Sequence, residues 1–183
     1  MINILIDEKA QKIFWFLWRN TREPYTIREV ARETEVSYGS TWAILKEYEK
    51  LKLVYGIEKP RAHLYVLNFD HPLCFHVWSL LNALMREKAT GRDTRETQEV
   101  NMAGEGFIVQ VKSNGRVRTV CCSDTRVKGL QTVTYKDFIR LCSDDREFYT
   151  TVWNSGIVLA GEKAFYDTMW ELAEKKVIGV GGK

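Results

Sequence analysis

Four side chains between residues 38 and 46 could contact a nucleic acid: Tyr38, Ser40, Trp42 and Lys46. They combine two hydroxyls, an indole and a cation, and with the small Ala43 they share one face of a predicted helix. Hydroxyl and ammonium groups in such a place contact base edges and phosphates. The spacing therefore predicts a surface that binds double-stranded DNA.

The elements that would position this face begin at Thr26. Glu29 follows three residues later, which is the pattern of a capping box, so a helix is expected from about Ile27. Glu35 and Val36 would form a short turn. Ser37 is a good N-cap for a second helix, which should run to about Lys50. The buried face of that helix is predicted to hold Thr41, Ile44, Leu45 and Tyr48.

Two strand-like segments follow, residues 51–58 and 63–69, joined by Lys59, Pro60, Arg61 and Ala62. Lys59 and Arg61 at this basic tip are expected to contact phosphates, and Arg28 on the first motif helix is expected to clamp the DNA backbone. Ser37 completes the predicted DNA-binding set. The alternative is an ordinary hairpin on a small helical domain, with a tip that is only solvated.

Residues 25–69 resemble the winged helix-turn-helix domain of bacterial and archaeal transcription regulators. The resemblance lies in Ser37, Ser40, Thr41, Leu45, Tyr48, Leu51 and Val54, whereas Lys52 stands where the family usually has glycine. It implies a sequence-specific regulator of archaeal type that binds DNA through the second helix. Winged helices also bind proteins, so a protein-interaction adaptor that uses the Trp-rich surface is the alternative function.

Composition limits the kinds of binding to expect. The chain has 183 residues, of which 45% are hydrophobic and 28% charged, and its 27 basic and 24 acidic side chains give a net charge of +3. So mild a charge argues against nonspecific coating of nucleic acid. No apolar run is long enough to cross a membrane and no signal peptide is evident, so a cytoplasmic protein is expected.

Aromatic residues are unusually dense in the helix predicted for residues 8–20. Its core stripe is expected to contain Ala10, Ile13, Phe14 and Leu17. Trp15, Phe16 and Trp18 broaden that stripe, and they are covered by a later segment, by a second subunit, or within a wide core.

A second apolar helix is predicted from Pro72 to about Lys88, with Phe75 and Trp78 beside its main stripe. An added helix in this place often joins two regulators into a homodimer, so that paired recognition helices address a symmetric site. The alternative is that the stripe packs on the second domain of its own chain. The stripe consists of Leu73, Val77, Leu80, Leu81 and Leu84.

The C-terminal region is predicted to be mixed α and β. An exposed linker at 90–106 precedes strands at 107–112 and 116–122, which Asn114 and Gly115 connect as a hairpin. A strand at 130–133 leads to a helix capped by Thr134, and Ser143 is expected to cap a further helix that Gly156 can terminate. A strand at 157–160 and a helix at 162–176, with Phe165, Met169 and Leu172 inward, complete this region.

Residues 134–172 resemble the tail of small archaeal nucleotidyltransferase-like proteins, some of which carry a winged helix in front. The matching positions are Asp137, Phe138, Gly156–Leu159, Gly161, Phe165 and Tyr166. That family holds catalytic metal ions with an Asp-x-Asp strand, and no Asp-x-Asp occurs here. Ser123 and Asp124 have no second acid at the required spacing, so a shortened fold without transferase activity is expected.

Other catalytic and metal-binding patterns are missing from the sequence. It contains no phosphate-binding Gly-rich loop, no nucleophile elbow and no zinc helix. The four cysteines, Cys74, Cys121, Cys122 and Cys142, have no zinc-finger spacing and are expected to be reduced thiols. His71, Cys74 and His76 do not share one helical face and lack a fourth ligand. We therefore expect no catalytic residues, metal or cofactor, and the sequence does not indicate an effector.

Together these patterns predict an α+β protein of four parts. They are a winged helix domain at 1–70, a connecting or dimerisation helix at 71–90, a linker at 91–106 and a mixed α/β domain at 107–183.

Overall fold

The computed structural model describes residues 7–21, 23–89, 106–113, 116–127 and 130–174. Within these ranges the chain forms seven helices and two small sheets, so the predicted α+β class is confirmed. The chain divides into two compact units, Met1–Leu81 and Asn82–Lys183. The division falls inside the helix that follows residue 71.

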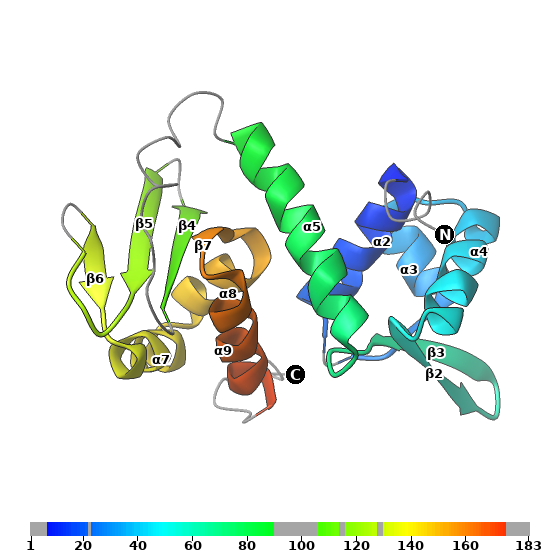
Figure 1. Cartoon of the computed structure of the whole chain (residues 1–183). Coiled ribbons are helices and arrows are strands. Elements are labelled where there is room, and N and C mark those ends of the chain that lie inside the picture. The colour runs from blue at the N-terminus through cyan, green and yellow to red at the C-terminus, as the bar shows by residue number, and fades with distance from the viewer. Residues whose placement is uncertain (1–6, 22, 90–105, 114–115, 128–129, 175–183) are drawn as a thin grey trace. The chain divides into compact units, whose positions relative to one another are not determined.

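The first unit holds three helices and a three-stranded antiparallel sheet of order β1-β3-β2, whose hairpin of β2 and β3 projects away from the helices (Figure 1). Strand β2 begins three residues later than expected because residues 51–53 close the end of the preceding helix. The elements are α2 (Glu8–Arg19), β1 (Tyr25–Thr26), α3 (Ile27–Thr34), α4 (Tyr38–Lys50), β2 (Val54–Lys59), β3 (Ala62–Leu67) and the first part of α5 (Pro72–Ala89).

Helix α2 supplies much of the core of the first unit through the predicted stripe and Trp18. The Trp18 ring stacks on Trp78 of α5, with ring centroids 5.4 Å apart, and lies 5.0 Å from the Phe69 ring. A later segment therefore covers Trp18, whereas Trp15 and Phe16 are half-buried. Dense aromatic packing of this kind adds to the burial energy of each ring.

Helix α5 begins at Pro72 as predicted, and Val77 and Leu81 of the predicted stripe are buried. The prediction is wrong for Leu80, which is 44% exposed, whereas Cys74, Trp78 and Asn82 are buried beside the stripe. The difference arises because two separate sets of contacts orient this helix. Trp78 packs in the first unit, and Asn82 makes hydrogen bonds to a strand of the second.

The second unit contains a four-stranded sheet of order β6-β5-β4-β7. Strands β4 and β5 pair antiparallel, as the Asn-Gly signal predicts, and β6 lies parallel to β5. The elements are β4 (Phe107–Ser113), β5 (Arg116–Cys122), β6 (Gln131–Val133), α7 (Tyr135–Asp144), α8 (Arg146–Ser155), β7 (Ile157–Ala160) and α9 (Glu162–Glu174).

The core of the second unit is built on alternate residues of β4. Phe107 packs edge-to-face against Phe138 of α7 and Phe165 of α9, with centroids 5.0 Å and 5.3 Å apart. Ile108 points to the other face, where it clusters with Cys121 and Leu159. This alternation is the two-residue period of a strand that is buried on both faces. The predicted inward residues Phe165, Met169 and Leu172 are buried.

The predicted cap of α8 is wrong. Ser143 lies inside α7, and its hydroxyl donates to the Ile139 carbonyl at 2.8 Å. Asp145 caps α8 instead, because its carboxylate accepts a hydrogen bond from the Phe148 amide at 2.8 Å. A carboxylate at a helix start is also favoured by the helix dipole, so an acid can take the place of a serine.

Parts of three predicted segments lie outside the described residues: linker residues 90–105, the hairpin turn 114–115 and the end of the last helix at 175–176. Gly106, placed in the linker by the sequence, is buried next to β4.

Candidate nucleic-acid interface

The exposed face of α4 carries two large aromatic side chains. Tyr38 is 54% exposed and Trp42 is 49% exposed, while the four residues predicted to be buried on the opposite face are all buried. Ser40 lies between them and is half-buried. Exposed apolar side chains that are grouped on one surface mark interaction sites, so this face is the first candidate for binding.

The turn before α4 fixes the direction in which this face points. Glu35 adopts a left-handed conformation with φ of 56°, and the Val36 amide donates to the Ala31 carbonyl at 3.1 Å. Val36 is buried, so the turn is held by packing as well as by hydrogen bonds. Ser37 then caps α4, because its hydroxyl accepts from the Ser40 amide at 3.4 Å and donates to the Ser40 hydroxyl at 2.9 Å. Ser37, a predicted contact residue, thus serves the helix start.

The end of α4 fixes the hairpin. Lys52 occupies the left-handed position with φ of 58°, and the Leu53 amide donates to the Tyr48 carbonyl at 2.9 Å. Asn68 reaches back and donates its side-chain amide to the Lys52 carbonyl at 2.9 Å. The helix therefore ends in a Schellman motif in which lysine stands where glycine is usual.

The Lys46 side chain contacts two neighbours in the first unit, Glu49 and Tyr65. Its ammonium lies 2.8 Å from the Glu49 carboxylate and 5.9 Å from the centroid of the Tyr65 ring. The hydrogen bond that the Lys46 ammonium donates to the Glu49 carboxylate raises the pKa of Lys46, and the same bond lowers the pKa of Glu49. Lys46 therefore stays charged, but its charge is compensated by a neighbour.

Three predicted phosphate contacts are exposed cations. Arg28 lies in the first turn of α3, Lys59 ends β2, and Arg61 lies at the hairpin tip. Among the described residues, none of these three side chains forms an ion pair or hydrogen bond. Their charge is therefore available to an anionic partner, unlike that of Lys46.

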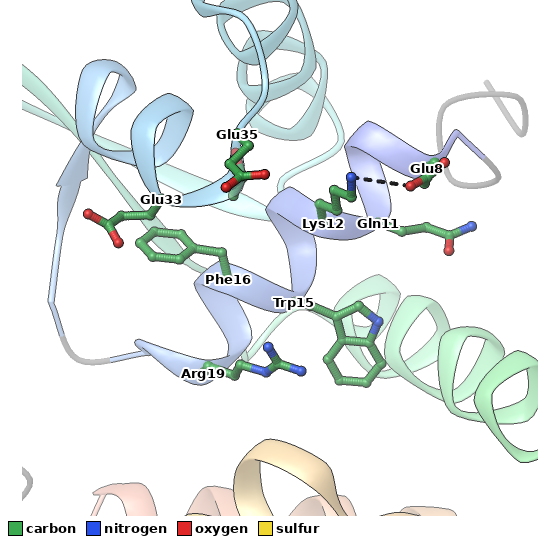
Figure 2. A pocket seen from close by; sticks show the side chains of 9 residues that line it. Glu8, Gln11, Lys12, Trp15, Phe16, Arg19, Glu33 and Glu35 are labelled. Carbon is green, nitrogen blue, oxygen red and sulfur yellow. Dashed lines mark ion pairs between the residues drawn. The ribbon is translucent and has the colours of Figure 1, made fainter. Parts of the chain in front are cut away.

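The first unit also has a surface pocket of about 410 Å³ beside α2. Figure 2 shows the rings of Trp15 and Phe16 on the α2 side, with Glu33 and Glu35 contributed from the end of α3. Lys12 pairs with Glu8 at 3.2 Å along the same helix. Because the lining carries both signs of charge, the pocket selects neither an anion nor a cation.

The second unit contains no comparable set of reactive groups in the ranges described. Burial raises the pKa of Cys122 and Cys142 to about 12, so both thiols are protonated at neutral pH and are poor nucleophiles. The Ser123 hydroxyl is occupied by a hydrogen bond with Thr125 at 3.2 Å, and Asp124 is exposed. All four cysteines are buried.

Within the described ranges, no three His, Cys, Asp or Glu side chains are grouped so that they could hold a metal ion. The helices found there also lack the combination of length and apolar composition needed to cross a membrane.

No family model, curated protein or solved structure matches the chain. Function therefore has to be inferred from the side chains themselves.

Glu49, His63 and Gly56 were not predicted to belong to the site. Glu49 pairs with Lys46 and lies near His63, and Gly56 lies next to both Glu49 and His63. The spacing of Lys46 and Glu49, three residues apart on a helix, was an available signal for their pairing. The approach of His63 depends on the hairpin and has no local signal.

Proposed function

We propose that residues 25–69 form a winged helix-turn-helix that binds double-stranded DNA in a sequence-specific manner, as part of a transcription regulator without catalytic activity. The element order α2-β1-α3-α4-β2-β3 and the sheet order β1-β3-β2 are compatible with this arrangement. The observation that carries the proposal is the face of α4, which leaves Tyr38 and Trp42 exposed near the helix N-terminus.

In this proposal α4 enters the major groove, where Tyr38, Ser40 and Trp42 meet base edges. Lys59 and Arg61 on the hairpin contact phosphates on one side, and Arg28 contacts the backbone on the other. These exposed cations supply the local charge that a net charge of only +3 does not. Lys46 joins the phosphate contacts if Glu49 releases it.

The test is selection of fragments from a random DNA pool by the full chain, followed by fluorescence anisotropy. Trp42→Ala combined with Lys46→Ala should weaken binding at least about tenfold, in keeping with loss of base and phosphate contacts. The matched control is Val117→Ala with Arg118→Ala, which removes an exposed apolar side chain and one cation from the second unit. Equal affinity of both double variants would contradict the proposal.

A protein-interaction adaptor is the second candidate function. The two exposed aromatic rings and the compensated charge of Lys46 favour it. Salt dependence separates the two functions, because DNA affinity falls steeply with ionic strength as counterions are released, whereas an aromatic protein contact depends on salt only weakly.

The exposed Leu80 on α5 is compatible with a homodimer joined through this helix. Sedimentation should then show a dimer that Leu80→Lys dissociates.

A regulator without catalytic activity should transfer no nucleotide. Incubation of the chain with labelled nucleotides and Mg²⁺ should therefore show no transfer, and any transfer would contradict a non-catalytic regulator.

A further inference from the structure

The Glu49 carboxylate joins α4 to the hairpin through its two oxygens. One oxygen, Oε2, lies 2.8 Å from the Lys46 ammonium, and the other, Oε1, lies 3.5 Å from Nε2 of His63 on β3. All three side chains are half-buried. One carboxylate therefore faces a permanent cation and an imidazole that becomes a cation on protonation.

Gly56 makes room for this arrangement. A Cβ at this position would lie 2.1 Å from Glu49 Oε1 and 2.5 Å from His63 Nε2, too close for either atom to remain in place. A side chain on this face of β2 would therefore push the carboxylate away from the imidazole.

The other charged and titratable groups around His63 come from both hairpin strands and from α4. Glu58 is the residue directly opposite His63 in the β2–β3 register. Tyr65 lies beside the imidazole, with ring centroids 4.8 Å apart. The charges of Lys46 and Glu49 sum to zero, and a proton on His63 makes the sum of the three side chains +1.

We propose that Glu49 is a positioning residue that withholds the charge of Lys46 from DNA phosphate, and that a proton on His63 gives the carboxylate a second cation, so that its charge no longer cancels that of Lys46 alone. This inference rests on the proposed DNA-binding function. It makes DNA affinity rise when His63 gains a proton as the pH falls. It also makes Glu49→Gln mimic the protonated state, since either change moves the cluster from zero to +1.

Anisotropy with a selected DNA fragment, at constant ionic strength between about pH 8 and pH 5.5, tests this. Glu49→Gln should bind more tightly at the upper pH, with a log K against log salt slope steeper by about one. His63→Gln should lose the pH dependence that the unmodified chain shows. Far-UV circular dichroism checks that each variant is folded.

The matched control is Glu47→Gln. Glu47 pairs with Lys50 at 3.2 Å on the same helix with the same three-residue spacing, but neither side chain belongs to the proposed interface. If Glu47→Gln raises affinity as much as Glu49→Gln, the effect is only bulk charge and the inference is overturned. An unchanged pH profile in His63→Gln overturns it as well.

A measurement without DNA separates this inference from the proposed function. The NMR signals of the Lys46 side chain should shift as His63 titrates, and this coupling should disappear in Glu49→Gln and in Gly56→Ala, which moves the carboxylate without altering any charge. Coupling in a chain that binds no DNA would contradict the proposed function alone. DNA binding without coupling would contradict only the role of Glu49.

Discussion

The outer strands of the two sheets differ in how their backbone N–H and C=O groups find hydrogen-bond partners. In the first unit, β2 is an edge strand and its residues 55–59 are all exposed, so solvent can hydrogen-bond to its free edge. In the second unit, the edge strand β7 is met by Asn82 of α5, whose side chain accepts from the Val158 amide and donates to the Val158 carbonyl, both at 3.0 Å. A side-chain amide thus replaces a neighbouring strand.

The difference shows where each unit can receive a partner. Buried backbone groups need protein partners, whereas groups in solvent do not. The second unit closes its edge strand with Asn82, while the first unit leaves the outer strand of its hairpin open beside the proposed DNA contacts. The largest stability effects are therefore expected at the closed edge.

Asn82→Leu should have the largest effect, because it leaves the Val158 amide and carbonyl buried without partners. The expected cost is about 2–4 kcal/mol of unfolding free energy, measured by urea denaturation. Asn68→Leu is the counterpart in the first unit. Asn68 is also buried but makes one side-chain hydrogen bond, to the Lys52 carbonyl, so its loss should cost less. Equal losses of unfolding free energy in Asn82→Leu and Asn68→Leu would contradict the idea that Asn82 stabilises the protein by pairing with the edge of β7.

Tyr48→Phe tests a buried link between helices of the first unit. The Tyr48 hydroxyl donates to the Ala10 carbonyl at 2.8 Å, so its loss should cost about 1 kcal/mol. Tyr135→Phe in the second unit removes a similar link, from α7 to Glu171 of α9, but at an exposed site. Solvent replaces that bond, so the denaturation midpoint should move less. A larger shift of the midpoint in Tyr135→Phe than in Tyr48→Phe would contradict the idea that burial makes the Tyr48 hydrogen bond the more stabilising one.

Lys52→Gly should stabilise the first unit. Lys52 holds a left-handed conformation that glycine adopts without steric cost, so the expected gain is about 0.5–1 kcal/mol. The second unit already has glycine at its positive φ of 74°, at Gly161. Thermal unfolding measures the gain, and Lys50→Gly, inside α4, should destabilise instead.

The smallest expected effect is on the free energy of unfolding at acid pH. The backbone hydrogen bond from Thr26 lowers the pKa of Glu29 below its ordinary value of 4.5. Glu29 therefore stabilises the folded state above that value, and this contribution is lost as pH falls through the lower, folded pKa. Glu29→Gln should reduce the pH dependence of unfolding below about pH 5. In the second unit, Asp137 on α7 accepts a hydrogen bond from the hydroxyl of Thr134, the N-cap of that helix, and Asp137→Asn provides the comparison.

The features that could be predicted from sequence are those that depend on neighbours within one or two helical turns. Thr26 and Glu29 form the expected capping box, and Ser37 caps α4. The exposure of Trp42 follows from the helical period, since its opposite face is apolar. Such local interactions specify structure before any distant contact forms.

Features that depend on distant contacts could not be predicted in this way. The contact of Asn82 with β7 joins residues 76 positions apart, and no periodic pattern marks it. The cap of α8 involved two candidates two residues apart, and only the length of α7 favours Asp145 over Ser143. The approach of His63 to Glu49 also depends on the hairpin, whereas the pairing of Glu49 with Lys46 is local and had a signal in their three-residue spacing.

The stacked indoles of Trp18 and Trp78 give the first unit an intrinsic optical reporter. Their ring planes are inclined by 21°. Trp18 also lies near Trp15 of its own helix, with ring centroids 6.4 Å apart, so the part of the aromatic signal that depends on Trp78 has to be identified by comparison with Trp78→Phe. Because Trp78 comes from α5, that part should appear only when α5 has docked. Refolding experiments can therefore time that event without a label.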